Sequence, residues 1–183
     1  MAHKDIKVIS FEPSTSNLRV LSRNISINNL SDKISINQFA LSDLVNVHET
    51  MNETNFEEGY SMSTFYYQTD FQGNKIKPKQ KYKIFGTTID YLLNNKILDF
   101  PNYVKIDVDG IEHKILKGAK SLLESTKIKS ILIEVNENFS EQYEEIKDLM
   151  NKNNFVLESK NQLPNLKNTK FSKNFNYIYY KKI

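Results

Sequence analysis

The chain has 183 residues, a length that fits a single domain. Hydrophobic residues make up 39% of it and charged residues 26%, which is enough apolar material for a packed core and excludes wholesale disorder. Cys is absent, which excludes disulfide scaffolds and thiol nucleophiles, and only three His are present, so we expect no metal centre. The net charge of +3 comes with Lys interleaved among Asp and Glu, which predicts no nucleic-acid partner.

No segment approaches the ~18–20 consecutive apolar residues that cross a bilayer, so we expect no membrane span. Residues 1–7 lack the apolar stretch of a secretory signal. Together these features predict a soluble, cytoplasmic protein with one domain over residues 1–183.

The N-terminal part predicts a strand, a helix and a second strand. Residues 7–11 are a short, β-branched apolar run, which favours a strand. Apolar residues recur with helical spacing over residues 14–28, which predicts a helix with Ser14 or Ser16 as its N-cap. Residues 34–41 are expected to form the next strand.

Residues 50–81 are polar with scattered aromatic side chains, and we expect them to form a long loop or lid insertion. Loops of that length inside a compact domain are usually functional or partly disordered. The rest of the chain alternates between helical and strand patterns. In chain order we predict a helix at 88–95, a strand at 103–108, a helix at 111–124 interrupted at Gly118, a strand at 130–135, a helix at 140–153, and a closing hairpin of 155–157 with 177–180.

This alternation predicts an α/β fold with a mostly parallel sheet and a C-terminal antiparallel hairpin. In such sheets, ligands bind beyond the carboxyl ends of the strands. Polar residues fall at the ends of three of the predicted strands, and we expect them to converge on one edge: Glu12, Asp107, Asp109, Glu134 and Asn136. The two oxygens of Glu12 match the two hydroxyls of a ribose, although a solvated turn residue is an equally good interpretation of Glu12.

The segment from Lys105 to His113 is the densest group of candidate residues. Strand alternation places Asp107 and Asp109 on one face, and we expect Asp109 chiefly to cap the following helix. Lys105 is expected to neutralise Asp107 in a buried pair. His113 is a candidate base near neutral pH, but an exposed histidine on the helix surface is the favoured interpretation.

The sequence KIDVDGIEHKILKGAKSLLE, preceded by TTIDYLL and followed by ILIEV, resembles the FkbM-type S-adenosylmethionine-dependent methyltransferases. The upstream segments VISFEPSTSNLRVLSRNISINNL and NQFALSD are similar to the second and third strands of the same domain. The resemblance covers residues 7–136, in the right order and with the right spacing. It implies a Rossmann-like class I methyltransferase fold. It also implies S-adenosyl-L-methionine as cofactor and O-methylation of a carbohydrate or natural-product hydroxyl, hence a small-molecule or saccharide acceptor.

The resemblance implies roles for individual residues as well. Glu12 of FEP would hold the cofactor ribose, and Asp107 would lie beside the positively charged sulfonium. The residues implied around the adenine are Phe39, Ala40 and Leu41. The residues implied on the acceptor side are Asp109, Glu112 and Glu134, with Ser61 and Ser63 of the GYSMSTF tract. The candidates for orienting or deprotonating the acceptor are Asp107, Glu112 and His113.

The sequence departs from the family pattern at its N-terminal end. The family's first strand ends in a Gly-rich turn, whereas the earliest glycine here is Gly59. We therefore expect an N-terminally truncated domain, in which the strand between those ending at Glu12 and Asp107 is missing. Its loss leaves an open slot, or the two neighbouring strands pair directly. A further N-terminal segment or a homo-oligomer would then complete the site.

Two other functions compete with methyl transfer. Asp107 and Asp109 match the D-x-D pair of a metal-dependent nucleotide-sugar glycosyltransferase, although a helix directly after Gly110 argues against it. The third interpretation is a non-catalytic, partner-dependent remnant, whose open sheet edges would drive association.

Overall fold

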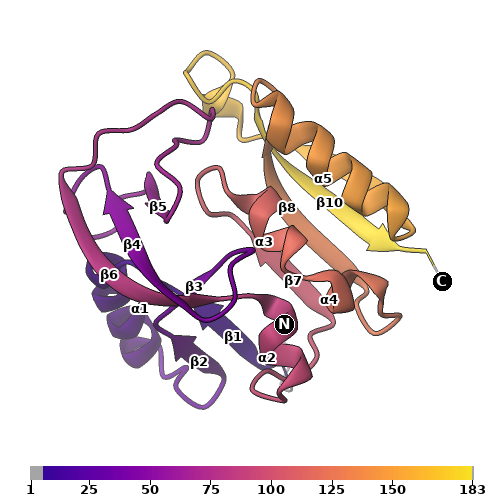
Figure 1. Ribbon diagram of the computed structural model, residues 1–183, viewed down its shortest axis with the longest axis horizontal. Coiled ribbons are helices and arrows are strands. Elements are labelled where there is room, and N and C mark those ends of the chain that lie inside the picture. Colours follow the sequence, from indigo (N-terminus) through magenta and orange to yellow (C-terminus); the bar gives the residue numbers. More distant parts are fainter. Residues whose placement is uncertain (1–5, 183) are drawn as a thin grey trace.

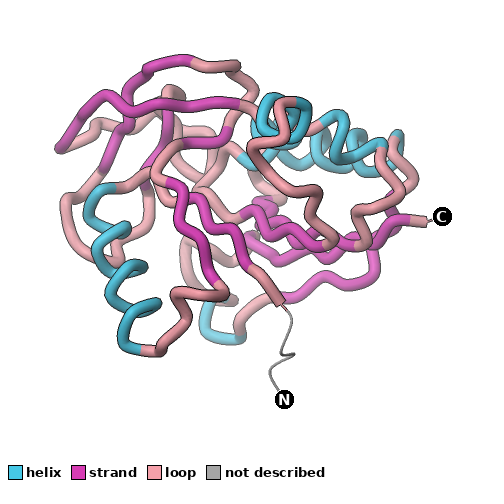
Figure 2. Tube along the Cα trace, turned by 90° about the horizontal axis from the view of Figure 1, so that it is seen from below, coloured by secondary structure: helices cyan, strands magenta, loops and turns pink. Residues whose placement is uncertain are grey.

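The computed structural model describes residues 6–182, whose strands form three sheets (Figure 1). The smallest is a parallel pair of β1 (Val8–Phe11) and β2 (Ile34–Asn37), connected by α1 (Thr15–Ile27). Figure 2 shows α1 running alongside this pair of strands. Ser14 is the N-cap of α1, as predicted, because its side-chain oxygen accepts a hydrogen bond from the Asn17 amide at 3.3 Å.

The second sheet has the order β7–β8–β10–β9. Strand β8 is parallel to β7, and β10 is antiparallel to both of its neighbours, which confirms the predicted closing hairpin. Helix α5 packs against β8 and β9, and also against α3 (Figure 1). The strands are β7 (Tyr103–Ile106), β8 (Ser130–Asn136), β9 (Phe155–Asn161) and β10 (Asn174–Lys181), and the helices are α3 (Glu112–Lys117), α4 (Lys120–Glu124), α5 (Ser140–Lys152) and the short 3-10 helix η1 (Pro164–Leu166).

The third sheet has the order β3–β6–β4–β5 and is mostly antiparallel, with one parallel pair formed by β3 and β6. Helix α2 follows β6 and is capped by Thr88, since the Thr88 hydroxyl accepts from the Tyr91 amide at 3.0 Å. The elements are β3 (Ala40–Leu41), β4 (Val47–Glu53), β5 (Ser63–Phe65), β6 (Gln80–Thr87) and α2 (Ile89–Asn94).

The main hydrophobic core lies between the second sheet and helices α3, α4 and α5. Leu116, Leu122, Ile131 and Ile133 are fully buried in it. A smaller cluster gathers around β4 and β6 and includes Ile111, which directly precedes α3. Of the described residues before Ala40, only Ile25 is a buried hydrophobic residue, and it belongs to neither cluster. The β1–α1–β2 unit therefore contributes little to either core.

The arrangement differs from the single, mostly parallel sheet that we expected. The parallel pairs are β1–β2, β3–β6 and β7–β8, but they belong to three different sheets. Strands β1 and β7 are each at the edge of their own sheet and do not pair with one another. The strand expected at 34–41 splits into β2 and β3, and between them the ring of Phe39 packs edge-on against Phe11 and Phe85 with centroids 5.3 and 6.1 Å away.

The expected long loop at residues 50–81 is also built differently. It holds the end of β4, all of β5 and the first residues of β6, which pair with one another. Within this range, only residues 54–62 and 66–79 lie outside the strands, as the connections between them. Between residues 6 and 182, no helix is long and apolar enough to span a bilayer.

Candidate functional site

Four carboxylates predicted to converge do influence one another electrostatically. Burial raises the pKa of Glu12, and the charges of Glu53 and Asp109 raise it further. Burial also raises the pKa of Asp109, with a further contribution from Asp107. Burial together with the charges of Asp107 and Asp109 raises the pKa of Glu134 to about 7. These side chains thus share one acidic rim, which we define as Glu12, Glu53, Asp107, Asp109 and Glu134.

The rim is built by the ends of strands from all three sheets. The Glu12 amide donates to the carbonyl of Asn37 at 3.1 Å, which keeps the exit of β1 beside the end of β2. Glu134 belongs to β8, which pairs in parallel with β7 up to Ile106, directly before Asp107. Asp107 and Glu134 therefore lie at one edge of their sheet, because β7 and β8 are parallel and end at the same side.

Glu53 is a member of the rim that the sequence did not reveal. It is the last residue of β4 and is fully buried. Its Oε1 accepts a hydrogen bond from the Tyr82 hydroxyl at 2.8 Å, whereas its Oε2 has no hydrogen-bond partner in the described part of the chain. The Tyr82 hydroxyl also accepts from the Thr15 amide at 3.0 Å, and burial raises its pKa to about 12. A buried carboxylate oxygen without a donor is unusual and points toward a ligand.

Asp109 holds a loop and does not cap the following helix. Its Oδ2 accepts a hydrogen bond from the Met62 amide at 2.7 Å. The N-cap of α3 is Ile111, which makes no side-chain capping bond, so the predicted capping role of Asp109 is wrong. Asp109 has a φ of 61°, and Gly110 follows with a φ of 120°. This left-handed turn directs the Asp109 carboxylate away from the α3 amides and toward residues 59–63.

Residues 59–63 lie between α1 and Asp109. The Gly59 amide donates to Asn17 Oδ1 at 2.8 Å, and Asn17 Nδ2 donates to the carbonyl of Tyr60 at 3.0 Å. Ser61 is exposed and Ser63 is half-buried at the start of β5. The segment is therefore tied to α1 on one side and to Asp109 on the other.

Glu112 is fully buried and both of its oxygens are engaged. Oε1 accepts from the Val108 amide at 2.8 Å, and Oε2 accepts from the Gly110 amide at 3.1 Å and from Gln142 Nε2 at 2.6 Å. Gln142 Oε1 in turn accepts from the Asn136 amide at 2.8 Å. Burial raises the pKa of Glu112 to about 8, although the amide donors oppose this shift. This network connects the turn after β7 to β8 and α5. Glu112 therefore holds in place the turn that carries Asp109.

Three other predicted residues have different surroundings from those expected. Lys105 and Asp107 are paired at 2.9 Å, but both are exposed, so the pair is not buried. His113 is buried at 2% exposure and packs edge-on against Phe139, so it is not a histidine of the helix surface. Burial lowers the pKa of His113 to about 4, which keeps its imidazole neutral.

The residues implied for the adenine lie at the junction of β1 and β3. Phe39 is half-buried against Phe11, Ala40 is buried, and Leu41 is half-buried. Ala40 and Leu41 pair with Gly86 and Thr87 of β6. The structure thus brings this segment next to the end of β1, where Glu12 follows.

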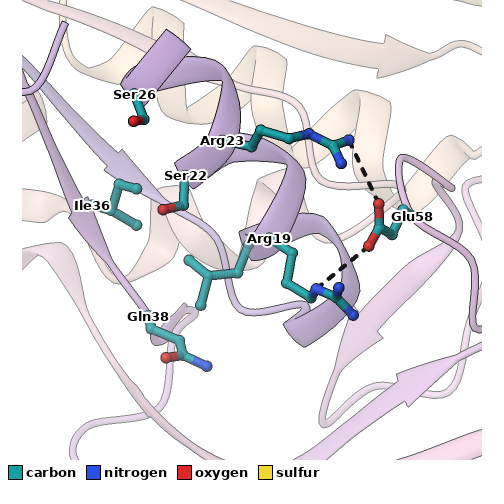
Figure 3. Close-up of a pocket in the computed structure, with 8 residues that line it drawn as sticks. Arg19, Ser22, Arg23, Ser26, Ile36, Gln38 and Glu58 are labelled. Carbon is teal, nitrogen blue, oxygen red and sulfur yellow. Dashed lines mark ion pairs between the residues drawn. The ribbon is translucent and has the colours of Figure 1, made fainter. Parts of the chain in front are cut away.

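A groove of about 670 Å³ lies on a different part of the surface, along α1 and β2 (Figure 3). Arg19 and Arg23 point along its rim toward Glu58, with ion-pair distances of 3.4 and 3.6 Å. None of the predicted site residues lines this groove. Its ion pairs are exposed and contribute little to stability.

The buried network predicts a structural role for Glu112. Replacing it by alanine leaves the amides of Val108 and Gly110 and the Gln142 side chain without their acceptor. We expect Glu112→Ala to lower the free energy of unfolding by at least about 3 kcal/mol. Urea denaturation measures this loss. The matched control is Glu144→Ala on the exposed face of α5, and an equally small effect of both changes would contradict the structural role.

The chain matches the family model described as the methyltransferase FkbM domain over residues 2–157. Among solved structures, it is similar to a methyltransferase FkbM from Methylobacillus flagellatus KT, with a TM-score of 0.58 and 16% sequence identity. That match covers 95% of this chain but only 36% of the other, so the chain spans about a third of its length.

A second similar structure is a proposed rRNA-methylase from Clostridium thermocellum. Its TM-score is 0.45 at 9% identity, over 97% of this chain and 73% of the other. No curated protein sequence matches the chain.

Proposed function

Because the chain belongs to the methyltransferase FkbM family, we propose that it contributes to methyl transfer from S-adenosylmethionine to a hydroxyl of a carbohydrate or natural product. The acidic rim is the observation that carries this proposal. Of these five carboxylates, only Asp107 has an ion-pair partner in the described part of the chain, Lys105, so the edge is acidic and attracts a positively charged ligand. The methyl donor of this class is a sulfonium cation linked to a ribose.

The residues of the rim suit the parts of such a donor. Glu12 offers its Oε2 to a vicinal diol, since its Oε1 already accepts from the Ser14 amide at 2.8 Å. Asp107 is exposed just after β7, where Lys105 pairs with it at 2.9 Å, and we assign this carboxylate to the sulfonium. The unpaired Oε2 of buried Glu53 is a further acceptor close to Glu12. When bound, S-adenosylmethionine supplies an activated methyl group on its sulfonium.

The chain's own contribution to the reaction is alignment and proton removal. When the acceptor oxygen bonds to the methyl carbon, the carbon–sulfur bond of the donor would break and leave a neutral thioether, and the hydroxyl proton must pass to a base. A base works best when its pKa is near the working pH, and Glu134 has a pKa of about 7. Glu112 is less suited, because both of its oxygens are already engaged. We therefore assign the base to Glu134, with the 59–63 segment covering the acceptor.

We expect Glu12→Gln to weaken the binding of S-adenosylmethionine about tenfold or more, because a charged acceptor of hydrogen bonds becomes neutral. The glutamine keeps an oxygen for the Ser14 amide, so the free energy of unfolding should barely change. Isothermal titration calorimetry measures the affinity. Glu57→Gln, on an exposed loop residue, is the control. An unchanged affinity in Glu12→Gln would remove Glu12 from the site.

Donor binding should also depend on pH through Glu134. Its pKa of about 7 means that the carboxyl loses its proton as the pH rises from 6 to 8. The added negative charge should strengthen binding of the cationic donor over this range. Calorimetric titrations at several pH values test this, with circular dichroism confirming the fold at each. In Glu134→Gln the pH dependence should flatten, and an unchanged slope would rule out this assignment.

A further inference from the structure

A second group of potential ligands lies between helices α3 and α5. It consists of His113 from α3 and of Glu141 and Glu145, which are one turn apart on α5. One ligand atom from each residue lies within 4.8 Å of the others. We call these three residues the interhelical cluster. Residues i and i+4 share one face of a helix, so both carboxylates are presented to the same neighbouring helix.

His113 is a buried polar side chain without a hydrogen-bond partner. It is 2% exposed, and its Nδ1 has no partner in the described part of the chain. Its Nε2 is directed at Glu141 Oε1 but lies 3.9 Å away, too far for a hydrogen bond. Glu145 Oε2 is likewise buried and without a partner. Buried polar atoms usually have partners, so Glu145 Oε2 and the Nε2 of His113, which faces Glu141 without a hydrogen bond, indicate a missing ligand.

Two lysines already form ion pairs with the carboxylates of the interhelical cluster. Lys114 Nζ lies 2.8 Å from Glu141 Oε1 and 4.0 Å from Glu145 Oε2, and Lys117 Nζ lies 2.8 Å from Glu145 Oε1. Lys114 has alternative partners on its other side. The negative charge of Asp43 raises the pKa of Lys114, and the Lys114 ammonium lies 5.7 Å from the ring centre of Tyr67. Lys114 can therefore leave the cluster without losing all of its favourable contacts.

We propose that the interhelical cluster binds one divalent transition-metal ion of the zinc class. Neutral imidazole with two carboxylates is a donor set that such ions favour, whereas Mg²⁺ and Ca²⁺ prefer oxygen ligands alone. Bonds of about 2.0–2.2 Å require the three side chains to move closer together, with Lys114 turning toward Asp43. Water would complete the coordination.

Such an ion would join the two helices that follow β7 and β8. Those strands carry Asp107 and Glu134, so the metal would fix the geometry of the acidic rim without taking part in the reaction. The proposal is independent of methyl transfer, because the cluster shares no residue with the rim. A bound metal also raises the stability of the folded state, since it binds no equivalent site in the unfolded chain.

The test is calorimetric titration of the metal-free protein with ZnCl₂, with thermal unfolding as a second measurement. We expect one saturable site, a higher melting temperature with Zn²⁺ than with Mg²⁺, and a visible absorption band when Co²⁺ replaces Zn²⁺. Glu145→Gln and His113→Gln should each weaken Zn²⁺ binding at least about tenfold. Glu144→Gln, on the exposed face of the same helix, should bind as the unchanged protein does.

Further variants separate this site from adventitious binding. His3→Gln and His48→Gln remove the other two imidazoles and should leave the affinity unchanged. Lys114→Met should bind Zn²⁺ more tightly, because it removes the competing ammonium. Circular dichroism confirms folding, and Glu145→Gln keeps the test valid if His113→Gln does not fold. The absence of saturable binding below about 1 mM Zn²⁺, or full affinity in folded Glu145→Gln, would overturn the proposal.

Discussion

Mutual repulsion among partly buried carboxylates is the constraint on which the candidate site depends. Burial raises the pKa of Glu12, Asp109 and Glu134, and the neighbouring negative charges raise each of them further. A fold gains no stability by gathering like charges where water is scarce. Such an arrangement is typical of a functional site, and a cationic ligand would relieve the repulsion.

The surrounding structure holds the rim in place through buried hydrogen bonds. Glu112 accepts from the turn that carries Asp109 and from Gln142 of α5, while Gln142 accepts from the end of β8. Gly110 must be a glycine, because a Cβ there would lie 2.7 Å from the carbonyl of Asp70. The turn after β7 therefore packs directly against the backbone of Asp70 and Phe71.

Local sequence signals predicted most of the helices and strands. Long-range packing determined how the strands pair and which side chains are buried. Ser14 was one of the two candidate caps for its helix because a cap needs only its own following turn. His113 was expected on the surface, but α5 covers it, and no local pattern reveals the packing of two helices. Glu53 was missed because a polar residue near the start of the polar segment 50–81 gives no apolar strand signal, although Tyr82, Ile84 and Gly86 of its partner β6 alternate as in a strand.

Nuclear magnetic resonance titration of the side-chain carboxyl carbons tests most directly whether the acidic rim exists. Glu134 should titrate near pH 7, and Asp109→Asn should lower the pKa of both Glu134 and Glu12, because it removes a negative charge that acts on each. If Glu134 titrates near its ordinary value and Asp109→Asn leaves both titrations unchanged, the carboxylates do not share one edge and the account is contradicted.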